Sequence, residues 1–164
     1  MNAELTHKQQ IDLKVCYFGT YRENYARNQI IIAGLRGNGI NVIECHEKLW
    51  QSVDDRVGAA SGGWLRPQFW WRVIKTYFNL LRYYHQIGNY DVLFVGYPGH
   101  FDVFLAWVLA KIRRKPLAWD VLNSLYLITT ERGITERSPL TVKFIRMVER
   151  WACQLPDMLF LDTA

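Results

Sequence analysis

Short apolar runs alternate with longer amphipathic segments along most of this 164-residue chain. The apolar runs predict strands at residues 13–18, 40–45, 91–95, 116–121 and 157–161. Apolar positions at helical spacing predict helices at residues 28–36, 68–87, 101–112 and 138–154. Gly37 and Gly88 mark helix ends, and Ser138 followed by Pro139 is typical of a helix start.

Strands that alternate with helices in this way indicate an α/β domain with a parallel sheet of about five buried strands, covered on both faces. Right-handed crossovers then favour a Rossmann-like, doubly wound order in which the first strand neighbours the third. We expect a polar tail over residues 1–12 and a single domain over residues 13–164. The piece between Cys45 and Gln68 shows no convincing strand, and its Gly58, Gly62, Gly63 and Pro67 predict a mobile loop.

Composition narrows the class of protein. Half of the residues are hydrophobic and 21% are charged, which excludes disorder and predicts a sizeable core. The net charge of +5 suits phosphorylated ligands or an anionic lipid surface, but the basic residues are too dispersed for a nucleic-acid binder. The three cysteines, far apart, suit a reduced cytosolic chain without a zinc site. Neither a signal peptide nor a membrane-spanning segment is visible, so we expect a soluble or peripheral protein.

In an open doubly wound sheet, ligands bind beyond the carboxyl ends of the strands, where the strand order reverses. Here that crevice lies between residues 19–25 and residues 97–102, with residues 120–126 as a third wall. Glycine permits close approach of a substrate, arginine pairs with phosphate, and histidine orients or deprotonates a hydroxyl. The candidates from this argument are Gly19, Arg22, Arg27, His100 and Asp120.

Each candidate also has a structural interpretation. Gly19 can simply end a strand, and Arg22 and Arg27 can be solvated. His100 can cap the following helix, and Asp120 can bond to a neighbouring loop. Several chemistries are excluded by spacing, because the chain has no G-x-G-x-x-G loop after its first strand, no Walker A loop and no G-x-S-x-G elbow. Its four histidines are scattered, so we expect no metal site.

Two basic features bear on membrane contact. In the predicted helix 68–87, one side carries Trp70, Ile74, Tyr77, Leu81 and Tyr84, and another carries Arg72, Lys75, Asn79 and Arg82. This pattern fits core packing or an interfacial membrane helix, and different faces can serve both. The basic run at residues 111–115 lies at a helix end remote from the crevice, which predicts a solvated terminus.

The chain resembles the N-terminal, acceptor-side domain of GT-B glycosyltransferases of the family 4 kind. The similar segments are VCYFGTY at residues 15–21, RNQIIIAGLRG at 27–37, YDVLFVG at 90–96, and VERWA at 148–152 followed by PDMLF at 156–160. Their order and spacing, over roughly residues 13–162, carry the resemblance, since each segment alone is weak. The segment most similar to the family is the last one, in which a helix ending in Glu-Arg precedes an aspartate and an apolar strand.

The resemblance implies transfer of a sugar from a nucleotide-sugar to an acceptor, in a cleft between two Rossmann-like domains. It implies that Gly19, Thr20, Tyr21 and His100 face the reacting centre, with His100 acting on the acceptor hydroxyl. We also expect Arg22, Gly99, Asp120 and Asn123 to contact the acceptor.

The family's donor site, with basic residues for the diphosphate and an E-x7-E pair of glutamates, lies in a C-terminal domain that we do not find in this sequence. We therefore expect no cofactor here, the nucleotide-sugar binding through a further domain or a partner chain. The expected location is cytoplasmic, with peripheral contact at the inner face of the membrane. The alternative is a non-catalytic Rossmann-like subunit that binds or recruits for a split transferase.

Overall fold

The computed structural model describes residues 12–49 and 66–161. The expected mobile loop falls mainly on residues 50–65, and the expected polar tail on residues 1–11, which lie outside this part of the chain. The strands are β1 (Lys14–Gly19), β2 (Asn41–His46), β3 (Val92–Val95), β4 (Leu117–Val121) and β5 (Met158–Leu161). The helices are α1 (Ala26–Gly37), α3 (Pro67–Gln86), α4 (Asp102–Arg113), α5 (Leu125–Glu131), α6 (Ile134–Arg137) and α7 (Pro139–Ala152).

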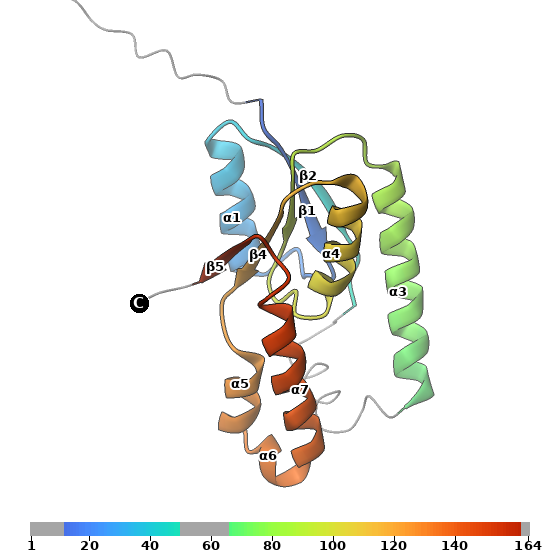
Figure 1. Ribbon diagram of the computed structural model, residues 1–164, viewed down its shortest axis with the longest axis vertical. Helices are drawn as coiled ribbons and strands as arrows, with labels where there is room; N and C mark the ends of the chain where they lie inside the picture. Colours follow the sequence, from blue (N-terminus) through green and yellow to red (C-terminus); the bar gives the residue numbers. More distant parts are fainter. Residues whose placement is uncertain (1–11, 50–65, 162–164) are drawn as a thin grey trace, which may run out of the picture.

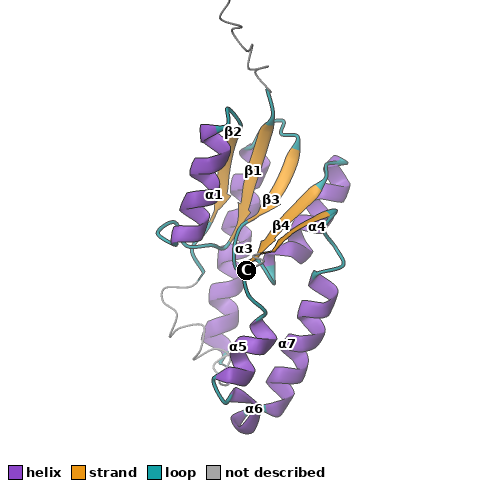
Figure 2. Ribbon diagram, turned by 90° about the vertical axis from the view of Figure 1, so that its left-hand side faces the viewer, coloured by secondary structure: helices purple, strands orange, loops and turns teal. Residues whose placement is uncertain are grey.

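The sheet is entirely parallel, in the order β2-β1-β3-β4-β5. This confirms the predicted α/β class, the doubly wound topology and the pairing of the first strand with the third. Helix α1 covers one face of the sheet, and α3 and α4 cover the other (Figures 1 and 2). Helices α5, α6 and α7 lie beyond the ends at which the strands finish (Figure 2).

Two apolar clusters hold these layers together. On the α1 side, Tyr17 and Phe94 stack with ring centroids 5.1 Å apart, and Ile32 of α1 packs against this cluster. On the opposite side, Phe18 and Trp119 belong to a larger cluster with residues from α3 and α4. Successive strand residues point to opposite faces, so both sides of the three central strands are filled.

Strand β5 corrects the prediction of five buried strands. All four of its residues are exposed, with Leu161 61% accessible. Its residues pair with β4 on one side, but among the described residues no strand continues the sheet beyond them. An apolar run therefore predicted the strand correctly and its environment incorrectly, because hydrophobicity alone does not distinguish a central strand from an edge.

Helix α3 follows the predicted packing side only in part: Tyr84 is buried and Tyr77 and Leu81 pack against the core, as expected. Its buried residues are Thr76, Leu80 and Tyr84, whereas Trp70 and Ile74 are at least half exposed. The face against the sheet is therefore rotated away from the tryptophan side of the helix.

Among the described residues, no helix combines the length and apolarity needed to cross a bilayer.

The basic run after α4 is not merely a solvated end. The guanidinium of Arg113 lies over the ring of Tyr84 at 4.5 Å and donates to the carbonyl oxygens of Ile87 and Gly88. It thereby joins the end of α4 to the end of α3. Its position is at the edge where the strands begin, remote from the crevice as expected.

The connection from β4 to β5 contains two helices that the sequence pattern did not predict, α5 and α6. The side chain of Ser124 accepts a hydrogen bond from Leu127 N at 3.1 Å and so caps α5. At α7, Pro139 occupies the first turn as expected. Ser138 stands at the N-cap position as expected, but its hydroxyl lies 2.6 Å from that of Thr141 and makes no capping bond to a backbone N–H.

Candidate functional site at the carboxyl edge of the sheet

The loops that follow β1 and β3 meet where these neighbouring strands end. Thr20 N donates a hydrogen bond to Asp102 Oδ2 at 2.7 Å, and the Thr20 hydroxyl donates to the same carboxylate at 3.0 Å. Thr20 follows β1 and Asp102 begins α4, so these bonds join two segments separated by 82 residues. The predicted meeting of the two loops is therefore confirmed.

Asp102 is the centre of this junction. It is 2% exposed and also accepts a bond from the Tyr77 hydroxyl of α3 at 2.7 Å. Burial raises the pKa of the Asp102 carboxyl above its ordinary value, and the bonds from Thr20 and Tyr77 act in the opposite direction. Burial also raises the pKa of Tyr77, and the nearby Asp102 charge adds to that shift. Asp102 thus ties the β1 loop, α3 and the first turn of α4 together.

Gly19 is required by this junction. Its φ is +139°, a conformation that side-chain-bearing residues rarely adopt. A Cβ at this position would lie 2.8 Å from Asp102 Oδ2. Close approach of a carboxylate from the protein itself therefore accounts for the glycine, and its expected place beside a substrate remains a prediction.

His100 lies inside the β3–α4 loop. It is 2% exposed, and its ring meets the indole of Trp119 edge-on with centroids 5.0 Å apart. Gly99 beside it has a φ of +50°, and an added Cβ would lie within 2.7 Å of Val95, Gly96 and Trp119 atoms. The loop is thus packed directly onto the end of β4. A catalytic role for His100 requires its ring to become accessible.

Asp120 forms an ion pair with Arg27 across the end of the sheet. Arg27 Nε lies 2.7 Å from Oδ2, and Nη2 lies 2.6 Å from Oδ1, in a two-bond arrangement. Asp120 is fully buried, whereas the Arg27 side chain is 21% exposed. The predicted phosphate contact of Arg27 and the predicted acceptor contact of Asp120 therefore both compete with this ion pair.

The remaining candidates are dispersed. Tyr21 is fully buried, and its hydroxyl donates to Glu44 Oε2 at 3.2 Å toward the β2 edge, so it lies away from the β3–α4 loop. Burial raises the pKa of Tyr21. Arg22 is half-buried in the β1–α1 loop, and Asn123 is exposed between β4 and α5. The structure therefore brings Gly19, Thr20, Gly99, His100 and Asp120 to one edge and leaves Tyr21 to one side.

Asn28 is a residue of this edge that sequence analysis missed. It is fully buried in α1, and its Oδ1 accepts bonds from the Tyr17 hydroxyl at 2.9 Å and from Tyr97 N at 3.0 Å. Its Nδ2 donates to Tyr97 O at 3.0 Å. Asn28 thus fixes α1 to the loop after β3. A polar residue inside the apolar helix pattern was the only available signal.

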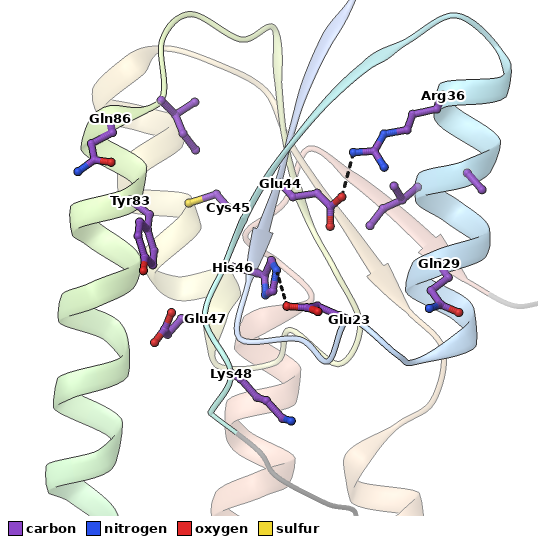
Figure 3. Close-up of a pocket in the computed structure, with 13 residues that line it drawn as sticks. Glu23, Gln29, Arg36, Glu44, Cys45, His46, Glu47, Lys48, Tyr83 and Gln86 are labelled. Carbon is purple, nitrogen blue, oxygen red and sulfur yellow. Dashed lines mark hydrogen bonds and ion pairs between the residues drawn. The ribbon is translucent and has the colours of Figure 1, made fainter.

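A wide groove of about 1160 Å³ lies elsewhere, along the edge strand β2 between α1 and α3 (Figure 3). Its charged residues are of both signs, and four of its side chains form two close contacts. Arg36 Nη2 lies 2.9 Å from Glu44 Oε1, and His46 Nε2 lies 3.3 Å from Glu23 Oε1. The groove is open, and its Arg36 is already paired with Glu44, so the carboxyl edge is the stronger candidate for a defined site.

The cysteines and the other potential ligands indicate no metal centre in the described part of the chain. No group of three or more His, Cys, Asp or Glu residues there could hold an ion. Cys16 and Cys45 are buried thiols on neighbouring strands, as expected from their place in apolar runs. Comparison of the chain with protein-family models, with curated proteins and with solved structures gives no match.

Proposed function

We propose that this domain binds the acceptor in a glycosyltransferase that moves a sugar from a nucleotide-sugar donor. The observation that supports this most strongly is the junction of Thr20 with Asp102 at 2.7 Å. It holds together the two loops in which the resemblance to family 4 GT-B enzymes places the reacting centre. Topology and resemblance select these loops independently.

In this proposal His100 orients the acceptor hydroxyl and takes its proton. The backbone at Gly19 and Thr20 lies beside the transferred sugar, and Asp120 and Asn123 bind acceptor hydroxyls. Because His100 is 2% exposed, binding of the acceptor must be accompanied by a movement of the β3–α4 loop. Arg22 and Gly99 complete the walls of the acceptor site, whereas Tyr21 supports it only from within the core.

The donor requires a second Rossmann-like unit, in the same polypeptide or a partner chain. That unit would supply the basic residues for the diphosphate and the E-x7-E glutamates. Electrostatic stabilisation of the phosphate leaving group is expected to contribute most to the rate of such a reaction, so the second unit is essential for turnover. The reaction would take place in the cytoplasm, at or near a membrane surface.

A second candidate is a non-catalytic subunit that recruits a partner in a split transferase. The burial of His100 and the Arg27–Asp120 ion pair favour it, because the His100 ring is covered by the protein and the charge of Asp120 is already paired. In that case the carboxyl edge is a structural junction, and binding occurs on other surfaces.

The two candidates are distinguished by isolating the donor unit and assaying the pair. The tagged chain is used to recover a partner, and transfer from a panel of nucleotide-sugars is measured with wild type and with His100→Gln. The enzyme proposal predicts at least a hundredfold loss of kcat and loss of the acidic limb of the pH–rate profile, where protonation of the general base lowers the rate. His85→Gln, on the exposed surface of α3, is the control and should keep full activity.

Full activity of folded His100→Gln would remove His100 from the mechanism. A recovered partner that turns over equally well without this chain would support the recruiting subunit. The folding of each variant is checked by urea denaturation before the kinetics are compared.

A further inference from the structure

The outward side of α7 carries a continuous apolar stripe. Leu140, Phe144, Met147 and Trp151 follow one another at intervals of four, three and four residues, which places them on one side of a helix. Their exposed fractions are 77%, 52%, 41% and 54%. An adjoining side of the same helix is already buried, through Thr141, Val142, Ile145, Val148 and Ala152. Helix α7 is therefore apolar on two sides, and only one of them packs within the domain.

Basic side chains border this stripe. Lys143, Arg146 and Arg150 are all exposed and lie on one flank of it. Glu149 is the only acidic residue of α7. Glu149 lies on the inner side, where its Oε2 accepts a bond from Tyr126 N at 3.0 Å. The outward side of α7 is thus apolar and cationic, with no negative charge of its own.

Helix α3 repeats the combination. Trp70, Trp71, Ile74 and Phe78 are at least half exposed. The helix contains no acidic residue, and its Lys75 and Arg82 are exposed. The first half of α3 and the whole of α7 extend past the ends of the strands, in the same direction (Figure 1). Two cationic, aromatic helices thus flank the carboxyl edge of the sheet.

This combination indicates a lipid partner. An interfacial helix carries tryptophan, phenylalanine and leucine on the side in contact with acyl chains and lysine or arginine beside them. Each basic residue near an anionic surface strengthens binding, and tryptophan favours the headgroup region. We propose that the outer side of α7, together with the exposed side of the first half of α3, binds the surface of an anionic lipid bilayer. This contact turns the carboxyl edge of the sheet toward the membrane.

The test is co-sedimentation of the purified chain with vesicles. Vesicles of phosphatidylcholine alone are compared with vesicles containing about one third phosphatidylglycerol. The proposal predicts binding to the anionic vesicles that weakens as salt is raised, and weak or no binding to the neutral ones. Because no sugar or donor unit is involved, the result is independent of the glycosyltransferase proposal.

Two sets of variants separate the apolar and electrostatic contributions. Phe144→Ser with Trp151→Ser should lower the partition coefficient at least about tenfold. Replacing Lys143, Arg146 and Arg150 by Gln should lower it by a similar factor and remove the preference for phosphatidylglycerol. Ile30→Ser, on the exposed side of α1, is the matched control and should bind like wild type.

Absence of binding to either kind of vesicle would overturn the proposal. It would also be overturned by wild-type binding of the Phe144→Ser/Trp151→Ser variant. Sedimentation velocity without lipid tests whether a second copy of the chain covers the stripe instead. A dimer that Phe144→Ser dissociates would show that a second copy of the chain, and not a bilayer, covers the stripe.

Discussion

The carboxyl edge of the sheet and the outer side of α7 depart from the usual arrangement of a folded protein in opposite ways. At the carboxyl edge, Thr20, Asp102 and Asp120 are polar yet buried, and each has a hydrogen-bonding partner. On α7, Phe144 and Trp151 are apolar yet exposed. Buried polar groups and exposed apolar patches are the informative exceptions to burial by hydrophobicity.

The two regions differ in whether contacts within the domain offset the free-energy cost of the unusual burial or exposure. The buried carboxylates are compensated within the domain, so their removal should lower its stability. The exposed stripe of α7 is not covered by any described part of the domain. Its removal should therefore alter only interactions with other molecules. Substitutions in the two regions therefore test the comparison directly.

The largest effect is expected at Gly99. Gly99→Ala would place a Cβ 2.5 Å from Val95 Cγ1 and 2.6 Å from Trp119 Nε1, and it would strain a backbone with φ of +50°. We expect a loss of about 3 kcal/mol or more in the free energy of unfolding, measured by urea denaturation. Gly39→Ala is the control, because φ is +80° there but the space around it is open. Its expected cost is about 1 kcal/mol, and equal losses in both variants would contradict the packed loop.

The ion pair at the edge should give a somewhat smaller effect. Arg27→Met leaves the fully buried carboxylate of Asp120 without its cation, and we expect a loss of about 3 kcal/mol. Adding Asp120→Asn to this variant removes the stranded charge and should recover at least half of the loss. A double variant less stable than Arg27→Met alone would show that the pair is not a coupled unit.

Asp102 should give a smaller effect that depends on pH. Its raised pKa means that the folded state holds the proton more tightly than the unfolded chain, whose ordinary value is 3.8. This contribution to stability is present below that value and is lost as the pH rises through the raised pKa. The free energy of unfolding of wild type should therefore increase relative to that of Asp102→Asn as the pH falls from 7 toward 4. A difference that changes in the opposite direction would indicate a lowered pKa.

The smallest effect is expected on the outer side of α7. Phe144→Ser should change the free energy of unfolding by less than about 0.5 kcal/mol, because the ring is 52% exposed. Val142→Ser, on the buried side of the same helix, should cost about 2 kcal/mol. A large loss at Phe144 would show that the stripe packs within the domain.

The sequence predicted the framework of the fold well. Apolar runs placed all five strands, and the chirality of crossovers led to the correct neighbours for β1. The meeting of the loops near Thr20 and His100 followed from that order. The exposed environment of β5 and the rotation of α3 were not predicted, because periodicity identifies an element but not what covers it.

The contacts within the candidate site were harder to predict from the sequence than the fold. Position at a strand end selected Gly19, His100 and Asp120, and all three lie at the carboxyl edge. Their actual contacts depend on side chains from distant segments, such as Arg27 on Asp120. Asn28 and Tyr77 carry no sequence motif, and only the folded arrangement shows that they hold the edge together.

Acceptor binding at the carboxyl edge can be measured on the isolated chain by its amide NMR spectrum during titration with free monosaccharides. Glucose, mannose, galactose and N-acetylglucosamine are added separately. We predict saturable shifts for at least one of these sugars, concentrated in residues 19–22, 97–102 and 120–124. Spectra that remain unchanged with all four sugars, or shifts confined to the β2 groove, would contradict acceptor binding at this edge.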